Sequence, residues 1–399
     1  MTNEVKNVPE LRFPEFDDEW KEKKANEIFN AISDKNHNGD LEVLSASQTQ
    51  GIIPRSLLEI DIKYNEKSLG NYKKTIPNDF IISLRSFQGG FEINNFMGLV
   101  SPAYTVLRFI ANDNVSDFFK QYFKMSRFIK KLDSMIYGIR DGKSISFKEF
   151  SIFKINLPIK EEQQKIGVFF NKLDRQIELE EQKLSLLEEQ KKGYMQKIFS
   201  QELRFKDENG NDYPEWEDKL ISDIGKVVTG NTPSKKDNDY WNSNQYVWVT
   251  PTDISNKKNI YTSGYQLSQK GFSKARQLPK NTLLITCIAS IGKNAILRIE
   301  GSCNQQINAV IPNDNYDVDY LYYAFEDVSK LMKSIAGKTA TQIVNKAVFE
   351  KLLLNVPIYE EQQKISGFLN KVDILIDKQT QKIDELKLRK QGFLQKMFV

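Results

Sequence analysis

Two long stretches of the chain place apolar residues at alternating steps of four and three, which is the pattern of a coiled coil. The stretches are residues 158–199 and 357–398, and each opens with a proline followed by a pair of glutamates. The alternative is a pair of ordinary linker helices, whose apolar faces are usually wider. Twelve apolar positions are predicted to form the helix seam: Ile166, Phe170, Leu173, Ile177, Leu184 and Leu187 in the first stretch, and Ile365, Leu369, Val372, Ile376, Ile383 and Leu386 in the second.

The two stretches are copies of one another. At a constant offset of 199 residues they are identical at 21 of 42 positions, without a gap. Both stripes are interrupted at the same two places, once by Glu180 or Gln379 and once by Lys191 or Lys390. Polar residues in a seam cost stability but can fix the register and the choice of partner. The chain is therefore expected to contain two copies of a unit in which a globular domain precedes a long helix.

The repeat predicts four segments: a first globular domain at 1–155, a first helix at 156–200, a second domain at 201–355 and a second helix at 356–399. Short apolar runs at 80–82, 104–109 and 282–286 indicate strands, and the patterns at 115–137 and 318–335 indicate amphipathic helices. Each long helix spans roughly 60 Å, and folding back antiparallel would bury both stripes. The predicted fold class is α+β: two mixed α/β domains separated by two long helices that form an antiparallel coiled coil, with internal pseudo-twofold symmetry.

The distribution of charge indicates affinity for a polyanion. The whole chain has 57 Lys and Arg against 53 Asp and Glu, but residues 219–298 have 12 against 4, and residues 63–154 have 15 against 8. The first of these regions also contains tyrosine, tryptophan, asparagine and glutamine, as nucleic-acid surfaces do. The alternative is an ordinary solvated surface. The predicted twofold arrangement favours double-stranded DNA, whose two backbones are related in the same way.

Several catalytic signatures are absent, and this narrows the expected function. One histidine, His37, and two cysteines, Cys287 and Cys303, exclude histidine triads and four-ligand zinc sites within the chain. Gly-Lys-Ser at 142–144 and Gly-Lys-Thr at 337–339 lack the earlier glycine of a P-loop. No proline is followed by proline or aspartate, so the methylation loop of amino-methylating adenine methyltransferases and the commonest nuclease motif are missing. We expect His37 in a surface or DNA-facing loop, and the cysteines to be packing residues.

Short motifs in a fixed order give the chain a resemblance to a known family. Both helices open with Pro-x-x-x-Glu-Gln-x-x-Ile. The second domain adds Tyr-Pro-Glu-Trp at 213–216, Gly-Asn-Thr-Pro-Ser at 230–234, Tyr-Trp at 240–241 and Trp-Val-Thr-Pro-Thr-Asp-Ile at 248–254. With the duplication, this order resembles the DNA specificity subunit of Type I restriction-modification systems over the whole chain. The first domain lacks the elements found at 230–234 and 240–241, as expected if it reads a different sequence.

The resemblance implies a cytoplasmic, non-catalytic subunit with two target recognition domains, at 1–155 and 201–355, and two conserved spacer helices. Each domain would read one half of a bipartite, asymmetric site on double-stranded DNA. The helical pair would set the spacer and dock two modification (methyltransferase) subunits and, through them, two restriction (translocase and nuclease) subunits. S-adenosylmethionine, ATP and Mg²⁺ would belong to these partners, and this chain would hold no cofactor or metal and contact no membrane.

Chemistry and position single out candidate DNA-binding residues, since lysine neutralises phosphates while arginine, asparagine and glutamine can bond two atoms of a base edge. The first domain contributes Lys35, Ser47, Gln48, Arg55, Arg85, Gln88, Arg140 and Lys143. The second contributes Thr232, Ser234, Lys235, Lys236, Tyr240, Trp241, Lys293, Asn304, Gln305, Lys338, Thr341 and Gln342. The alternative for each is a solvated loop residue or, for Trp241, a core residue. Two other functions stay open: a self-contained DNA modification enzyme with unrecognised catalytic residues, and a coiled-coil adaptor protein.

Overall fold

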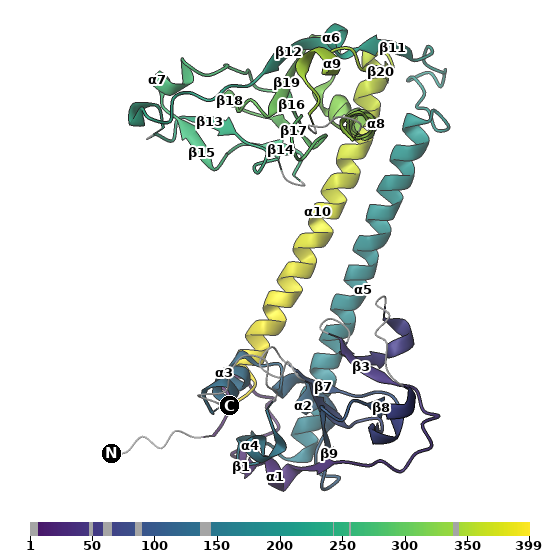
Figure 1. The fold of residues 1–399 in the computed structure, drawn as a ribbon, viewed down its shortest axis with the longest axis vertical. Helices are drawn as coiled ribbons and strands as arrows, with labels where there is room; N and C mark the ends of the chain where they lie inside the picture. Colours follow the sequence, from purple (N-terminus) through teal and green to yellow (C-terminus); the bar gives the residue numbers. More distant parts are fainter. Residues whose placement is uncertain are drawn as a thin grey trace. The chain divides into compact units, whose positions relative to one another are not determined.

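The chain divides into two compact units, each of which combines one globular domain with parts of both long helices (Figure 1). The first unit contains residues 1–182 and 380–399, and the second contains residues 183–379. The long helices are α5 (Lys160–Phe199) and α10 (Tyr359–Lys396). The computed structural model describes residues 7–47, 51–58, 66–83, 90–135, 145–241, 243–254, 257–337 and 343–399.

The first domain is built on a four-stranded antiparallel sheet with the order β2–β9–β6–β7. The bounds of these strands are Phe29–Ile32, Thr105–Phe109, Phe80–Ile82 and Phe91–Ile93. Three antiparallel pairs accompany the sheet: β1 (Lys21–Lys24) with β10 (Lys154–Leu157), β3 (Leu44–Ser47) with β4 (Gly51–Pro54), and β5 (Lys73–Thr75) with β8 (Gly98–Val100). The helices are α1 (Ala25–Ile28), η1 (Arg55–Leu57), η2 (Glu66–Asn71), α2 (Ser116–Tyr122), α3 (Ser126–Met135) and α4 (Phe147–Phe150).

Phenylalanine dominates the core of this domain, and it explains one departure from the predicted elements. The segment 115–137 is predicted as a single helix, but its described part, 115–135, forms two helices, α2 and α3, with a turn between them. Phe123 and Phe128 are both buried, with ring centroids 5.0 Å apart. In one continuous helix, residues five positions apart point about 140° away from each other. The turn is therefore what brings both rings into one core.

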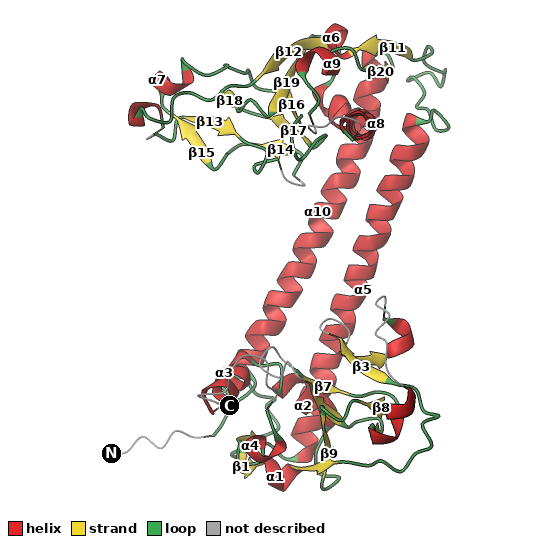
Figure 2. Cartoon of the chain, in the orientation of Figure 1, coloured by secondary structure: helices red, strands yellow, loops and turns green. Residues whose placement is uncertain are grey.

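The second domain contains a five-stranded sheet and a three-stranded sheet (Figure 2). The larger sheet has the order β12–β19–β16–β17–β14, with bounds Gly225–Thr229, Ile307–Pro312, Thr282–Thr286, Asn294–Leu297 and Asn259–Ile260. The smaller has the order β15–β13–β18, with bounds Tyr265–Leu267, Tyr246–Val249 and Gly301–Cys303. A separate antiparallel pair joins β11 (Glu217–Leu220) to β20 (Leu353–Val356).

The helices of the second domain are α6 (Ile221–Ile224), η4 (Asn238–Tyr240), α7 (Gln269–Phe272), α8 (Val318–Ala336) and α9 (Lys346–Phe349). The predicted strand at 282–286 and the predicted helix at 318–335 are confirmed as β16 and α8. Helix α8 packs on β16 and β17, and its buried side chains complete the core of the larger sheet.

The long helices run antiparallel within each unit. In the first unit Lys390 pairs with Asp174 and Lys387 pairs with Glu181, so positions rise along α5 as they fall along α10. In the second unit the rings of Tyr194 and Phe368 lie 5.1 Å apart, edge to face. All twelve apolar residues predicted for the seam are buried or half-buried.

The polar interruptions of the stripe are paired rather than solvated. Lys191 Nζ lies 2.6 Å from Asp373 Oδ1, and Lys390 Nζ lies 2.5 Å from Asp174 Oδ1. These two ion pairs are equivalent at the 199-residue offset with the roles of the helices exchanged. Glu180 accepts a hydrogen bond from Lys382 at 2.5 Å. Each pair matches one register of the two helices, which is the use of polar seam residues that the sequence indicates.

The glutamates of the repeated Glu-Gln motif fasten each long helix to the N-terminal segment of the domain that precedes it in the chain. Arg12 donates from Nε and Nη2 to both carboxylate oxygens of Glu162, at 2.7 Å each. Arg204 does the same to Glu361, at 3.3 and 2.7 Å, and Trp216 Nε1 donates to the same carboxylate at 3.1 Å. Both glutamates are fully buried. Bidentate pairs of this kind fix geometry as well as charge.

The glutamines of the same motif fasten each domain body to its helix. Gln163 Oε1 accepts from the Val115 backbone N–H at 3.0 Å, and Gln362 Oε1 accepts from that of Asp317 at 2.9 Å. Each glutamine also donates from Nε2 to the carbonyl of the proline before its helix, at 3.1 and 2.9 Å. The two copies therefore share one joint, although the domains that they carry differ.

Candidate nucleic-acid interface

An aromatic cluster is rooted in the three-stranded sheet of the second domain and ends at the surface. Trp248, 3% exposed, lies on β13 with its ring centroid 4.9 Å from that of Trp241 and 6.0 Å from that of Tyr265. Trp248 and Tyr265 are partners in the antiparallel register of β13 and β15, so their side chains share one face of the sheet. Tyr265 is 54% exposed. The cluster thus presents an aromatic side chain to solvent on a buried base.

Two indoles of this cluster hold the loop at residues 230–234. Trp241 Nε1 donates to the Ser234 carbonyl and Trp248 Nε1 donates to the Asn231 carbonyl, both at 3.0 Å. Ser234 itself is exposed, whereas the preceding Pro233 is buried. Trp241 is half-buried and thus serves both as a packing residue and as part of the surface.

The same loop lies against the turn that follows β18. A Cβ atom on Gly230 would lie 2.2 Å from the Cys303 carbonyl oxygen, so only glycine allows this approach. Thr232 Oγ1 donates to Gln305 Oε1 at 2.6 Å. Two predicted DNA-binding residues, more than 70 positions apart in the sequence, are thereby brought together.

Asn304 and Tyr240 have contacts that shape this surface from below. Asn304 is 7% exposed, and its side chain bonds the backbone N–H and the side chain of Gln306, at 3.0 and 3.1 Å. Tyr240 is half-buried, and its carbonyl accepts from the Ser268 N–H at 3.0 Å. Their prediction as DNA-binding residues stays a prediction, and in this structure both support loops that carry other candidates.

Lysines border the aromatic cluster. Lys235 Nζ lies 5.7 Å from the centre of the Tyr265 ring, and Lys270 Nζ lies 5.6 Å from that of Tyr240. Lys270 also hydrogen-bonds Asp239 at 2.9 Å, which lowers the pKa of the Asp239 carboxyl and raises that of Lys270. Within the described chain Lys235 forms no ion pair, so its charge is available to an anion. Two further cations of this surface are exposed, Lys236 and Lys274.

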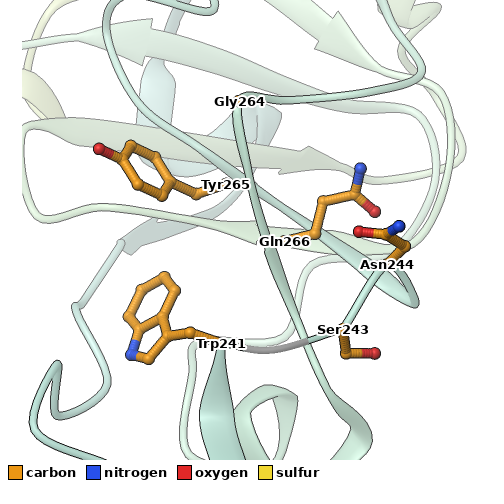
Figure 3. A pocket seen from close by; sticks show the side chains of 6 residues that line it. All are labelled: Trp241, Ser243, Asn244, Gly264, Tyr265 and Gln266. Carbon is orange, nitrogen blue, oxygen red and sulfur yellow. The ribbon is translucent and has the colours of Figure 1, made fainter. Parts of the chain in front are cut away.

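A hollow of about 440 Å³ lies at the edge of the three-stranded sheet, next to the aromatic cluster (Figure 3). It is lined by Trp241, Ser243, Asn244, Gly264, Tyr265 and Gln266. Sequence reasoning named Trp241 as a candidate and Tyr265 as an aromatic of the basic region, but it missed the polar members. Asparagine and glutamine are frequent throughout this region, and only the pairing of β13 with β15 shows which of them share an edge.

Lys293 lies elsewhere on the second domain. It is exposed on the turn between β16 and β17 and lines, together with Lys333, a different hollow of about 350 Å³. It therefore does not join the aromatic cluster. Three other candidates of this domain lie outside the described residues: Lys338, Thr341 and Gln342.

Three candidates of the first domain are described. Lys35 is exposed, and the burial of Lys73 together with the charge of Lys35 lowers the pKa of Lys73. Ser47 ends β3 opposite Gly51, and Arg55 begins η1. The remaining candidates of this domain lie outside the described residues: Gln48, Arg85, Gln88, Arg140 and Lys143.

Both ring nitrogens of His37 form hydrogen bonds with nearby backbone groups. Its Nδ1 accepts from the Gly39 N–H at 3.1 Å, so the proton resides on Nε2, which donates to the Tyr72 carbonyl at 3.0 Å. With both ring nitrogens bonded, the imidazole orders the loop. Cys287 and Cys303 are buried, as predicted for packing residues, and burial raises the pKa of Cys287 to about 11 and that of Cys303 to about 12.

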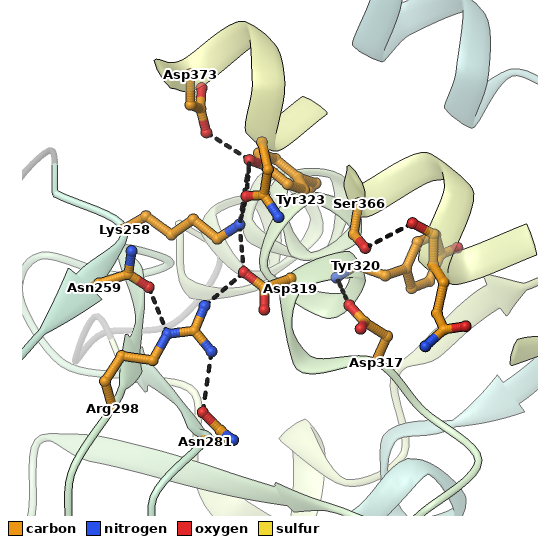
Figure 4. A network of polar contacts seen from close by, with 12 residues as sticks. Lys258, Asn259, Asn281, Arg298, Asp317, Asp319, Tyr320, Tyr323, Ser366 and Asp373 are labelled. Carbon is orange, nitrogen blue, oxygen red and sulfur yellow. Dashed lines mark hydrogen bonds and ion pairs between the residues drawn. The ribbon is translucent and has the colours of Figure 1, made fainter. Parts of the chain in front are cut away.

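A buried polar network ties the second domain to the long helices of its unit (Figure 4). Asp319, at the start of α8, accepts from Lys258 at 2.7 Å and from Arg298 at 2.5 Å. Lys258 also donates to the Tyr323 hydroxyl at 3.2 Å, and that hydroxyl donates to Asp373 of α10 at 2.5 Å. Since Asp373 pairs with Lys191 of α5 as well, the network reaches both helices.

The protonation of this network follows from its burial. Burial raises the pKa of Asp319, but the hydrogen bonds from Lys258 and Arg298 outweigh it, so the net pKa lies below the usual value. Burial lowers the pKa of Lys258 despite the opposing effect of Asp319. Burial and the bond to Asp373 both raise the pKa of Tyr323, which keeps that hydroxyl protonated as a donor.

Across the described ranges, there is no group of three or more His, Cys, Asp or Glu side chains that could hold a metal ion. In the same part of the chain, no helix combines the length and the apolar character needed to cross a membrane.

Both copies of the repeat are similar to known proteins. The model of a family described as Type I restriction modification DNA specificity domain matches residues 17–189 and 213–388. The chain is 34% identical over 186 residues to the Type I restriction enzyme MjaIX specificity subunit of Methanocaldococcus jannaschii, covering 45% of this chain and 43% of that protein. It is 29% identical over 189 residues to the Type I restriction enzyme EcoR124I/EcoR124II specificity subunit of Escherichia coli, covering 45% and 46%. These matches span less than half the length of either relative.

Two solved structures have a similar fold over nearly the whole chain. The Type I restriction-modification S subunit from M. genitalium has a TM-score of 0.60 and 13% identity, covering 98% of this chain and 99% of that one. A structure described as the basis of complex assembly and conformational transition of the type I R-M system has a TM-score of 0.59 and 16% identity, covering 95% and 97%. At these identities the likeness is one of fold, and it confirms the predicted fold class of two mixed domains with two long helices.

Proposed function

Because the chain belongs to the family of the Type I restriction modification DNA specificity domain, we propose that it selects the DNA site of a Type I restriction-modification complex. Each globular domain reads one half of a bipartite, asymmetric site on double-stranded DNA, and the helical pair sets the spacer. The observation that carries the proposal is the surface of the second domain, where an exposed aromatic residue, lysines and amides share one sheet edge.

The chemistry of that surface suits duplex DNA. Exposed lysines neutralise phosphates and fix the register, while amide and hydroxyl groups bond base edges in the grooves. A pair of antiparallel strands fits the major groove, which is about 12 Å wide. The β13–β15 ribbon is the outer part of the three-stranded sheet, and its free edge, β15, with Lys235 over the Tyr265 ring, is the part that a groove can receive.

We propose that catalysis belongs to partners. Two modification subunits, docked on the helices, would supply S-adenosylmethionine binding and adenine methylation, and two restriction subunits would supply ATP- and Mg²⁺-dependent translocation and cleavage. The absence of methylation and nuclease motifs from the sequence supports this division. A complex that acts on cellular DNA would operate in the cytoplasm.

The test is to map methylated adenines in DNA treated with the chain and its modification partners. We expect methylation at a two-part sequence that changes in one half when one domain is altered. Methyl transfer by the purified chain alone would identify a self-contained enzyme instead. Binding that is absent, or that shows no salt dependence, would favour an adaptor, because phosphate contacts give a steep salt slope.

A further inference from the structure

We infer that Asn244 and Gln266 form an adenine-reading pair at the edge of the second recognition domain. This inference rests on the proposed function and names the residues and the base that one half-site requires. It begins from four amide side chains near the ends of β13 and β15: Asn244, Gln245, Gln266 and Gln269.

Two of these four amides are occupied within the protein. Gln245 Oε1 accepts from the Gln269 backbone N–H at 2.9 Å, and the Tyr246 hydroxyl donates to Gln269 Oε1 at 2.5 Å. Among the described residues, the side chains of Asn244 and Gln266 have no hydrogen-bond partner. The structure thus uses one amide pair to hold the ribbon and leaves the other pair open to a ligand.

The open pair lies where a ligand can reach it. Strand β15 is the edge of its sheet, and Gln266 lies on the opposite face of that strand from Tyr265. Asn244 is exposed and Gln266 is half-buried. Figure 3 shows their amide groups next to one another, on the other side of β15 from the rings of Trp241 and Tyr265. Both line the 440 Å³ hollow.

The chemistry of an amide selects adenine among the four bases. An amide offers one acceptor and two donors from a planar group, and adenine presents an N7 acceptor beside an N6 donor in the major groove. Guanine presents two acceptors there, which leaves the amide oxygen facing another oxygen. Cytosine presents a donor, and thymine an acceptor and a methyl group. Only adenine matches both ends of the amide.

Cations beside the hollow would hold the duplex at this edge. Lys235 lies over the Tyr265 ring, and Lys236 is exposed on the same loop. Contacts of this kind position the protein on the backbone and carry no sequence information themselves. Substituting an amide should therefore change specificity, whereas substituting these lysines should weaken binding to all sequences.

The experiment uses the full chain in complex with its modification subunits and a duplex library randomised at both half-sites, with bound sequences counted before and after selection. Gln266→Leu is expected to lose adenine preference at one position of one half-site by about 5- to 100-fold. Asn244→Leu is expected to act at the same or the adjacent position. Gln277→Leu, an amide of the same domain whose Nε2 bonds the Phe272 carbonyl, is the matched control and should leave all preferences unchanged.

A second variant tests the chemistry by gain of preference. Gln266→Glu is expected to replace adenine by cytosine at the affected position, because a carboxylate only accepts and cytosine donates from N4. Unchanged preferences in both Gln266 variants, with binding retained, would overturn the inference, as would a uniform loss across all sequences. If the wild-type complex selects no sequence at all, the proposed function fails and the inference fails with it.

Discussion

Glu162 and Glu361 occupy the same position in the two copies, and each is a buried carboxylate held by an arginine from the N-terminal segment of its domain. The sequence shows these residues as part of a repeated motif but not their partners. Arg12 and Arg204 lie at an offset of 192 rather than 199, so the constant spacing that reveals the helices does not reveal the pairs. Only the fold brings the arginines to the helix starts.

Replacing one of these carboxylates should destabilise its unit. We expect Glu361→Gln to lower the free energy of unfolding by about 1–3 kcal/mol, because it removes the charge bonded by Arg204 and Trp216. Urea unfolding followed by tryptophan fluorescence measures this loss. The neighbouring Glu360→Gln is the control: Glu360 is exposed, and an equal loss in both variants would mean that the buried pair is not responsible.

Two glycines make opposite predictions for the same substitution. Gly230→Ala should cost about 1–3 kcal/mol, since its Cβ would meet the Cys303 carbonyl at 2.2 Å and displace the 230–234 loop. Gly193→Ala, on α5 with nothing within 4 Å of the new Cβ, should stabilise by about 0.5–1 kcal/mol through helix propensity. Thermal unfolding of both variants checks this. A neutral Gly230→Ala would refute the close approach.

Side chains proposed to touch a ligand are the least predictable from sequence. Thr232 and Gln305 are both candidates from the sequence and do meet, because motif glycine and aromatic residues mark their loops. Asn244 and Gln266 could not be predicted, since the sequence does not distinguish an amide that bonds its neighbours from one that faces solvent. Distinguishing the two requires the strand register, which depends on contacts between distant parts of the chain.

At the scale of elements, the long helices can be predicted from periodicity alone, because twelve apolar positions in two matching stripes have to be buried against another surface. The break between α2 and α3 does not, since the 115–137 pattern remains amphipathic across it. Competition between helix continuity and burial of Phe123 and Phe128 decides that point. Local patterns give the type of an element more reliably than its ends.

The two residues of an ion pair in the seam should be energetically coupled to each other. Lys390→Glu places a second carboxylate beside Asp174 and should destabilise the first unit, whereas adding Asp174→Lys should restore most of the loss. The expected coupling in a double-mutant cycle is about 0.5–1 kcal/mol, since both side chains are partly exposed. Chemical unfolding of the four variants gives the value. Additive effects would show that the pair does not contribute to pairing of the helices.

The network around Asp319 predicts a pH dependence. Because the pKa of Asp319 is lowered in the fold, its ionised form stabilises the protein above its ordinary pKa of 3.8 and loses that effect as pH falls through the lower folded value. Asp319→Asn should therefore cost about 2–4 kcal/mol at pH 7, leaving Lys258 and Arg298 without their carboxylate. The difference from wild type should shrink near pH 3.

Urea unfolding at both pH values tests this dependence on Asp319. The exposed Asp314→Asn serves as the control, since Asp314 lies outside the network. A penalty for Asp319→Asn that is the same at both pH values would show that the carboxylate charge is not what holds the network.

At the scale of the whole molecule, the exposed lysines beside the aromatic cluster should contribute to affinity for DNA without contributing to sequence specificity. Replacing Lys235 and Lys236 together by alanine should reduce the slope of log affinity against log salt by about 0.9 for each phosphate that is no longer neutralised, equally for all sequences. Fluorescence anisotropy with duplexes at several salt concentrations measures it. Lys226→Ala with Lys351→Ala, two exposed lysines of the same domain outside the aromatic surface, should leave the slope unchanged.

The shared joint has a consequence for how such a protein acquires new specificity. Among the described residues, the side chains of the two motif glutamines bond only backbone atoms, those of Val115 in one copy and of Asn315 and Asp317 in the other, besides the proline that opens each helix. A backbone amide or carbonyl is available from almost any residue, so this part of the fastening places few demands on the inserted sequence. A foreign domain grafted between these borders by recombination would keep this backbone joint, while side-chain contacts such as that of Tyr323 with Asp373 would have to be replaced by its own.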